Sequence, residues 1–238
     1  MLHALRLEQK AARELRVTDS ATSRALDRAA TSELGIPSIV LMEHAAHGAA
    51  RVLSERVQPG TGAVLVLCGP GNNGGDGLAL ARLLSPHARV VLTAPPDPVR
   101  APDAALELTI LQRSGIDVEI GLDASALDAQ MQGAGLIVDA MLGTGLDRAP
   151  RGRIAEWIAW TASRREDVIA IDLPSGLDAD TGEAYDPCVT AAATVTFARP
   201  KPGQFLRDGP ARCGDVRVVT IGLPEPWVET WLEERSGH

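Results

Sequence analysis

The residues best suited to chemistry lie in a glycine-rich segment, CGPGNNGGDGLALARLL, at positions 68–84. Gly69, Gly71 and Gly74 follow the spacing G-x-G-x-x-G, which occurs in loops that bind dinucleotides. Glycines there permit positive φ angles and let a ligand approach the backbone, and the start of the following helix offers unpaired N–H groups to an anion. The segment therefore predicts a ligand site at the start of a helix, although the spacing alone is not specific.

Three side chains distinguish this segment from an ordinary dehydrogenase loop. Asn72 and Asn73 place two amides in the turn, and Asp76 lies close to the predicted helix start. Asp76 could simply cap the helix, which is worth ~1 kcal/mol, but a carboxylate at this position would repel a pyrophosphate. The acidic ribose ligand expected about twenty residues further on is also poorly placed, because Asp97 follows two prolines instead of closing a strand. These residues indicate a ligand site unlike that of a common oxidoreductase.

Two further segments place an aspartate at the end of an apolar run. Asp139 is followed by the glycine turn Gly143–Gly145, and Asp172 is followed by Ser175. Either aspartate could instead cap a helix or close a turn. Together with an amide oxygen and a hydroxyl, however, the carboxylates are oxygen donors of the kind that hard cations take. The sequence has no Cys/His cluster for zinc, no G-x-S-x-G nucleophile elbow and no G-x-x-x-x-G-K-[ST] phosphate loop.

These segments need a scaffold that brings strand ends together, and the hydrophobic pattern predicts one. Short, β-branched apolar runs alternate with stretches that have apolar residues at helical spacing. This alternation predicts right-handed βαβ crossovers and a mainly parallel sheet covered on both faces. Ligands of such sheets bind at the carboxyl ends of the strands, so the three motifs should meet at one edge. The predicted strands are 63–68, 89–94, 118–120, 136–139 and 168–172.

The remaining elements complete a single Rossmann-like α/β domain with three αβα layers. Two helices, over residues 19–35 and 37–56, should precede the first strand. Two later runs, at 194–198 and 215–222, lie too close together for another crossover helix and should add strands at one edge of the sheet. The predicted organisation is an N-terminal extension (1–16), one domain (17–224) and a C-terminal tail (225–238).

Composition excludes several classes of protein. With 238 residues, 45% of them hydrophobic, and a net charge of -8, the chain can bury one core but lacks the basic field that nucleic-acid binding needs. Cys68, Cys188 and Cys213 lack metal spacing, which indicates free thiols in a reducing compartment. No apolar run is long enough for a membrane helix, and Glu8 and Glu14 make the amphipathic extension unlike a mitochondrial presequence. We therefore expect a cytoplasmic protein with no nucleic-acid and no membrane partner.

On these residues the sequence resembles the NAD(P)HX epimerase family, also known as the YjeF N-terminal domain. The resemblance covers nearly the whole chain from about residue 17, and its most specific feature is the glycine-rich segment combined with D-x-P-S-G. The matching motifs follow the family's order: LMEHAA (41–46), GPGNNGGDG (69–77), DAMLGTG (139–145), DLPSG (172–176), TVTFARPKPG (194–203) and CGDVRVVTIGLP (213–224).

The resemblance implies an isomerase that interconverts the R and S forms of hydrated NADH and NADPH (NADHX and NADPHX) in nicotinamide-cofactor repair. It also implies a homodimer and a potassium ion (K+) bound by Asn73, Asp139 and Ser175. The nucleotide substrate would be held by Asn72, Asn73, Gly74, Gly75, Asp76, Gly143, Thr144, Gly145, Leu146, Asp147, Arg148, Ala149 and Asp172. Many bacterial relatives carry a dehydratase domain after this module, and because this chain ends at residue 238 we expect its functional partner to be a separate NAD(P)HX dehydratase.

Asp172 is the predicted catalytic residue. The hydroxyl of the substrate lies on a carbon next to the ring nitrogen, so epimerisation needs one group that gives and takes a proton in a rigid pocket. Lys201, in the turn PKPG, could meet a phosphate, but we expect a solvated turn lysine. Two alternatives stay open: an NAD(P)-dependent oxidoreductase that uses Gly69, Gly71 and Gly74, and a catalytically silent nucleotide-binding or dimerisation module on the same fold.

Overall fold

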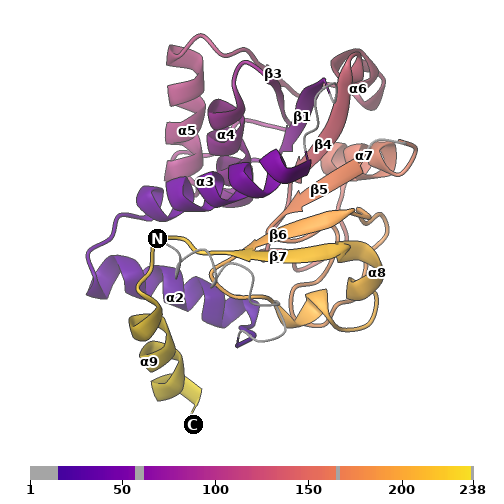
Figure 1. The fold of residues 1–238 in the computed structure, drawn as a ribbon. Coiled ribbons are helices and arrows are strands. Elements are labelled where there is room, and N and C mark those ends of the chain that lie inside the picture. Colours follow the sequence, from indigo (N-terminus) through magenta and orange to yellow (C-terminus); the bar gives the residue numbers. More distant parts are fainter. Residues whose placement is uncertain (1–15, 57–61, 165–166, 237–238) are drawn as a thin grey trace.

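A seven-stranded parallel sheet forms the centre of the protein (Figure 1). The computed structural model describes residues 16–56, 62–164 and 167–236, so the predicted N-terminal extension, apart from Arg16, lies outside the described residues. Every neighbouring pair of strands is parallel. The prediction of an α/β fold on a parallel sheet is confirmed. The strands are β1 (Ala63–Cys68), β2 (Ala88–Leu92), β3 (Val118–Ile120), β4 (Ala134–Ala140), β5 (Asp167–Ile171), β6 (Ala193–Phe197) and β7 (Asp215–Val219).

The order of the strands reverses between β1 and β4. The order is β3-β2-β1-β4-β5-β6-β7, so the chain runs outward from β1 to β3 and then returns to the other side of β1. Val66 pairs with Val138 and Cys68 with Ala140, which brings the ends of β1 and β4 level with each other. The loops after these two strands diverge, and in open α/β sheets this divergence creates the ligand-binding crevice.

Helices cover both faces of the sheet (Figure 1). In β1, Val64 and Val66 belong to one buried cluster and Leu65 and Leu67 to another, because side chains alternate along a strand. The two clusters form the hydrophobic core, one on each face of the sheet, as the predicted three-layer arrangement requires. Helices α3 (Ser38–Arg56), α4 (Asn72–Leu84) and α5 (Pro102–Arg113) contribute to the first cluster, and α6 (Ala124–Met131) and α7 (Gly152–Thr161) to the second.

Strands β6 and β7 extend the sheet beyond β5, but the connection between them differs from the prediction. It contains a 3-10 helix, η2 (Pro202–Gln204), and a short helix, α8 (Gly209–Cys213). Because β7 is parallel to β6, the chain must return to the starting end of the sheet between them. These short pieces make that return, so the expectation that no helix fits in this connection was wrong.

Two further helices pack against each other outside the layers. Helix α2 (Ser20–Glu33) begins after Asp19, whose side chain accepts a hydrogen bond from the Thr22 N–H at 2.6 Å. The C-terminal residues form α9 (Glu225–Ser236), which points away from the sheet in Figure 1. None of the helices in the described part of the chain is long and apolar enough to span a membrane. The apolar cluster that joins α2 to α9 consists of Leu26, Ala29, Val228, Trp231 and Leu232.

Three charged side chains hold the far end of α4. Arg82, on α4, donates hydrogen bonds to Glu43 on α3 and to Glu107 on α5. The Glu107 side chain is fully buried. Burial, followed by a hydrogen bond with Glu43, raises the pKa of Glu107 to about 7, while the charge of Arg82 opposes the rise. The three helices on this face of the sheet therefore share a polar contact that takes up a proton near neutral pH.

We expect Glu107→Gln to change the pH dependence of stability. Because the folded-state pKa of Glu107 is raised, its proton contributes stability that is fully present below about pH 4.5 and is lost as the pH rises through about 7. The free energy of unfolding of the wild type should therefore fall relative to that of Glu107→Gln between pH 4.5 and 7.5, by on the order of 2 kcal/mol.

Urea unfolding of both proteins at the two pH values measures this difference. Glu119→Gln, which removes an exposed carboxylate, is the matched control. A difference between wild type and Glu107→Gln that does not change with pH would contradict the prediction.

Candidate active site

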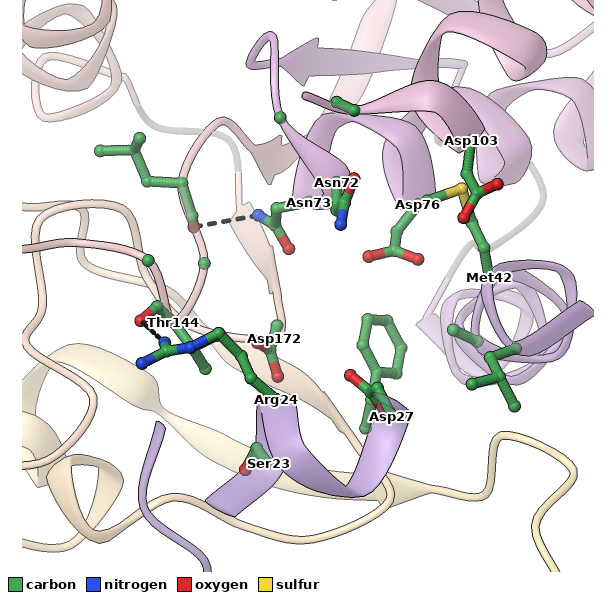
Figure 2. A pocket seen from close by; sticks show the side chains of 18 of the residues that line it. Ser23, Arg24, Asp27, Met42, Asn72, Asn73, Asp76, Asp103, Thr144 and Asp172 are labelled. Carbon is green, nitrogen blue, oxygen red and sulfur yellow. Dashed lines mark hydrogen bonds between the residues drawn. The ribbon is translucent and has the colours of Figure 1, made fainter. Parts of the chain in front are cut away.

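A cavity of about 720 Å³ opens where the strand order reverses. Its walls come from α2 and α3, from the start of α4, from the glycine turn after β4 and from the loops after β5 and β6. This volume is in the range of small-molecule sites, roughly 300–1,000 Å³. The three sequence motifs therefore meet at one cavity. Its polar side chains, shown in Figure 2, include Ser23, Arg24, Asp27, Asn72, Asn73, Asp76, Asp103, Thr144 and Asp172.

Two of the motif glycines are required by backbone packing. A Cβ atom at Gly69 would lie 1.9 Å from the carbonyl oxygen of Met141, and one at Gly74 would lie 1.9 Å from the carbonyl oxygen of Gly69. The loops after β1 and β4 therefore touch through their backbones. A Cβ at Gly71 would meet nothing within 4 Å, and Gly71 lines the cavity. Gly71 is thus the position of this motif that a ligand can approach directly.

Helix α4 begins earlier than the sequence pattern predicts. Its first residue is Asn72 and its N-cap is Gly71, which supplies no side-chain hydrogen bond. Asn72 and Asn73 therefore lie in the first helical turn, and Asp76 lies inside the helix. The alternative in which Asp76 caps the helix was wrong, because the chain has already turned at Gly71. The first N–H groups of α4 lack a side-chain cap and lie beside the cavity, an arrangement suited to an anion.

The structure brings Asn73, Asp139 and Ser175 together around the backbone of Leu142. Ser175 donates its backbone N–H to Asp139 Oδ2 at 2.7 Å and its hydroxyl to Asp139 Oδ1 at 2.6 Å. The Leu142 N–H donates to Ser175 Oγ at 2.9 Å, and Asn73 Nδ2 donates to the Leu142 carbonyl at 2.9 Å. Three loops that follow three different strands are therefore joined in one hydrogen-bonded network.

The oxygen atoms of this network suit a monovalent cation. Asn73 Oδ1 is buried and has no hydrogen-bond partner, which costs free energy unless another group binds to it. Burial raises the pKa of Asp139 to about 6, although hydrogen bonds from Ser175 and Met141 lower it. A divalent ion usually draws several carboxylates. The described residues contain no group of three or more His, Cys, Asp or Glu side chains placed for a metal.

Asp172 follows β5 and has an unusual backbone. Its φ of 64° lies in the left-handed region, which non-glycine residues rarely adopt. Its N–H donates to the Val195 carbonyl at 2.7 Å, and Gln204 Nε2 donates to its carbonyl at 3.0 Å. The carboxylate is held as well, because Lys201 Nζ and the Thr196 hydroxyl donate to Oδ1 at 2.5 and 3.1 Å. Surrounding contacts thus fix both the backbone and one carboxylate oxygen of Asp172.

Lys201 is buried, so the expectation of a solvated turn lysine was wrong. Its exposed fraction is 2%, and its ammonium also donates to the Thr196 hydroxyl at 2.9 Å and to the Phe197 carbonyl at 3.2 Å. The Asp172 carboxylate supplies the counter-charge that a buried ammonium needs. The two residues are 29 positions apart in the sequence, and they meet because β5 and β6 are neighbours in the sheet.

Other carboxylates share the cavity with Asp172. Burial, followed by the charges of Asp172 and Asp27, raises the pKa of Asp76 well above its usual value. Burial also raises the pKa of Asp27 to about 6, with Lys201 lowering it and Asp172 raising it, although the Asp27 side chain stays accessible. Asp103 lines the same cavity and adds to the effect on Asp76. The cavity therefore gathers carboxylates that repel one another around the ammonium of Lys201.

The contribution of α2 to the cavity was not predicted from the sequence. Ser23, Arg24 and Asp27 line the cavity, and Arg24 Nη1 donates to the Thr144 carbonyl at 3.0 Å. The spacing of these residues predicts one polar face of a helix, because residues three or four positions apart lie next to each other on a helix surface. Nothing in that pattern tells which part of the protein the face approaches.

The residues that the resemblance assigns to the substrate fall into two groups. Those that line the cavity are Asn72, Asn73, Asp76, Gly143, Thr144, Gly145, Leu146 and Asp172. Gly74 and Gly75 are buried beneath it, and a Cβ at Gly75 would lie 2.7 Å from the Met42 methyl. Asp147 and Arg148 are exposed and pair with each other at 3.8 Å, and Ala149 also lies outside the lining. Contact of the second group with a substrate stays a prediction.

Comparison with known proteins assigns the chain to a family. The family model described as YjeF-related protein N-terminus matches residues 38–203. This span contains the three motifs that meet at the cavity. The chain belongs to this family. The match begins at the first residue of α3, so α2 lies before it.

Members of the family are similar over most of this chain. The NAD(P)H-hydrate epimerase of Rhodopirellula baltica is 38% identical over 208 residues, which cover 84% of this chain and 82% of that protein. The bifunctional NAD(P)H-hydrate repair enzyme Nnr of Moorella thermoacetica is 41% identical over 213 residues, which cover 86% of this chain and 40% of that protein. The chain thus spans about two fifths of the bifunctional relative. The crystal structure of yeast ynu0 shares the fold, with a TM-score of 0.76 and 21% identity over 91% of this chain and 93% of that one.

We expect Lys201→Met to destabilise the protein by about 3–5 kcal/mol, because removing one partner leaves the Asp172 carboxylate buried without a cation. The double variant Lys201→Met/Asp172→Asn should recover part of this loss, since it leaves no unpaired charge. Denaturant unfolding of the wild type, both single variants and the double variant measures the coupling. Arg153→Met, which removes a more exposed ion pair with Glu156, is the control and should cost less than about 1 kcal/mol. Strictly additive losses would contradict a coupled pair.

Proposed function

We propose that this chain is an NAD(P)H-hydrate epimerase, an isomerase that interconverts the R and S forms of NADHX and NADPHX. The observation that carries the proposal is the cavity itself. It has a helix start suited to an anion, and it contains a carboxylate, Asp172, held by Lys201 and Thr196. Membership of the family and the name of the R. baltica relative, which this chain matches over most of both lengths, support the same activity.

The two sides of the cavity suit the two parts of such a substrate. The first turn of α4 can bind the diphosphate through the N–H groups that follow Gly71. The turn Gly143–Gly145 offers further backbone groups on the neighbouring wall. The nicotinamide ring would then lie near Asp172. In this pose the reacting carbon meets a proton-transfer group rather than a second cofactor, which favours an epimerase over an oxidoreductase.

Epimerisation needs only proton transfer and a rigid pocket. The hydroxyl leaves with a proton while the ring nitrogen stabilises the resulting cation, and water then adds to the other face of the ring. Asp172 gives or takes the proton. Lys201 and Thr196 bind one carboxylate oxygen, which restrains the rotation of the side chain and leaves Oδ2 for the substrate. The left-handed backbone at Asp172 aims the side chain and is itself fixed by Val195 and Gln204.

Purified protein should equilibrate separated R- and S-NADHX much faster than buffer does, and Asp172→Asn should slow turnover by roughly 10²–10⁴-fold, the usual contribution of general acid–base catalysis. Asparagine keeps the shape and can still accept the Lys201 hydrogen bond, so substrate binding should survive. Chromatographic separation of the epimers over time measures the rate.

Asp117→Asn, which changes an exposed aspartate between α5 and β3, is the control variant. A wild-type rate equal to that of buffer, with folded protein, would refute the epimerase assignment and favour a silent binding module. Near-normal turnover by Asp172→Asn would move the proton transfer to another group.

We further propose that K+ binds at Asn73, Asp139 and Ser175. The unpartnered Oδ1 of Asn73, the Asp139 carboxylate and the Ser175 hydroxyl are hard oxygen donors with one formal charge among them. A bound K+ would supply positive charge that offsets part of the acidity of the cavity. It would also restrain the loops after β1, β4 and β5, which these three residues connect.

Potassium should raise the thermal stability of the wild type relative to an equal concentration of a bulky cation such as tetramethylammonium. An ion that binds only the folded state adds about 2.7 kcal/mol at a concentration of 100 Kd. Asp139→Ala and Asn73→Ala should abolish the potassium-specific part of the shift, because each removes a ligand. Thermal unfolding in the two salts measures it. If potassium shifts the thermal stability of the wild type and of both variants equally, Asp139 only caps the end of its strand and binds no ion.

The name of the M. thermoacetica relative describes a bifunctional repair enzyme, and this chain matches two fifths of it. Dehydration of NAD(P)HX is therefore the partner reaction that we propose for this chain. Cys68, Cys188 and Cys213 are free and buried, which supports a reducing, cytoplasmic environment. The homodimer that the resemblance implies stays a prediction.

A further inference from the structure

The stereochemistry of epimerisation requires proton transfer on both faces of the ring. In the R and S forms the hydroxyl stands on opposite faces of the carbon next to the ring nitrogen. To convert one into the other, a proton must be delivered to the leaving oxygen on one face and removed from the entering water on the other. A single carboxylate fixed to one wall reaches only one face of a ring that stays in place. The opposite face needs a second proton-transfer group, which must come from another wall of the cavity.

Asp27 enters the cavity from a different wall. Figure 2 shows its carboxylate in the cavity on α2, whereas Asp172 comes from the end of β5 and Asp76 from α4. Within the described residues the Asp27 carboxylate makes no hydrogen bond or ion pair, so both of its oxygens are available to a ligand. Burial raises its pKa most, Lys201 and Arg28 lower it, and Asp172 raises it.

Contacts in the first two turns of α2 fix the part of the helix that carries Asp27. The Ser20 N–H and hydroxyl donate to the two oxygens of Asp180, at 2.6 and 2.8 Å. One turn later, Arg24 donates to the Thr144 carbonyl in the glycine turn. On the other side, Leu26 is buried in the cluster that joins α2 to α9. These contacts hold the helix backbone, so the Asp27 side chain enters the cavity from a defined place, which acid–base catalysis requires.

Asp27 fits the role better than Asp76, the other carboxylate at hand. Burial, followed by the charges of Asp172 and Asp27, raises the pKa of Asp76 well above its usual value, so its surroundings disfavour the carboxylate form that accepts a proton. A pKa of about 6 lets Asp27 both give and take a proton in the same range. Asp76 also belongs to the α4 segment that faces the predicted diphosphate. Asp27 lies before residue 38, where the family match begins.

We propose that Asp27 is a second catalytic acid–base group, acting on the face of the ring opposite the face that Asp172 serves. This inference rests on the proposed epimerase function. In one direction the Asp27 carboxyl group donates its proton to the hydroxyl oxygen. The C–O bond breaks with its electron pair on oxygen, water leaves, and the nitrogen lone pair forms the C=N bond of the cation.

The second half of the reaction uses Asp172. Water attacks the same carbon from the opposite face, its electron pair forms the new C–O bond, and the C=N electron pair returns to nitrogen. The proton lost by that water passes to the Asp172 carboxylate. Asp172 then holds the proton that the reverse direction needs, and the carboxylate of Asp27 is ready to accept one. Before a second turnover in the same direction, Asp172 releases its proton to water and Asp27 takes one up from water.

An isotope experiment distinguishes one proton-transfer group from two. Each NADHX epimer is prepared with oxygen-18 in its hydroxyl and incubated in ordinary water with the wild type, Asp27→Asn or Asp172→Asn. Chromatography measures epimerisation, and mass spectrometry measures loss of the label without inversion. Glu33→Gln is the control, because it removes a carboxylate from α2 outside the cavity. Thermal unfolding verifies that each variant is folded.

We expect both aspartate variants to lose epimerisation by roughly 10²–10⁴-fold and yet to keep label exchange on one epimer each. Asp172→Asn should exchange the epimer whose hydroxyl faces Asp27, and Asp27→Asn should exchange the other. Asp27→Glu should restore part of the epimerisation. A merely structural role of Asp27 would not produce opposite stereochemical preferences in the two variants.

Two outcomes overturn the inference while leaving the epimerase function intact: near-normal epimerisation by Asp27→Asn, or exchange of the same epimer by both variants. A wild type that neither epimerises nor exchanges label faster than buffer overturns the proposed function as well.

Discussion

Direct contact between the backbones at Gly69 and Met141 is the constraint on which the site depends. A side chain at Gly69 would strike the Met141 carbonyl, so only glycine lets the loops after β1 and β4 meet. Once they meet, Leu142 lies within reach of both Asn73 and Ser175. The network that joins three strand ends therefore follows from close packing at the one place where the sheet reverses its strand order.

The second property of the cavity is its charge. The charge of Asp172 raises the pKa of both Asp27 and Asp76. The ammonium of Lys201 is buried beside Asp172. This resolves a conflict in the sequence motif, where a carboxylate at position 76 should repel a diphosphate. Burial raises the pKa of Asp76 well above its usual value, so the site disfavours the charged form that would repel the diphosphate. The N–H groups at the uncapped start of α4 can then attract an anion with less repulsion from Asp76 on the same helix.

Features that depend on neighbours in the sequence were predictable from the sequence. The strands 63–68 and 118–120 have the predicted bounds, and the helices before the first strand lie within the predicted ranges. Burial on alternate faces produces the pattern that identifies such strands, and parallel strands direct their carboxyl ends to one edge. Asn73, Asp139 and Ser175, which the resemblance to the family selects, were therefore expected at one edge of the sheet before their contacts were known. The start of α4 was misjudged, because a run of glycines gives no local sign of where a helix begins.

The sequence by itself thus determined the class of fold, the edge at which the site lies and the polar residues that follow the strands, since short-range patterning encodes all of these. Only the tertiary structure decided which distant residues meet. It placed Lys201 against Asp172 across two neighbouring strands, and it folded α2 over the cavity so that Asp27 faces the same space. A lysine in a proline-rich turn and an aspartate on an amphipathic helix look like solvated surface residues. Their surroundings come from segments far away in the chain, and protonation and burial depend on those surroundings rather than on the local sequence.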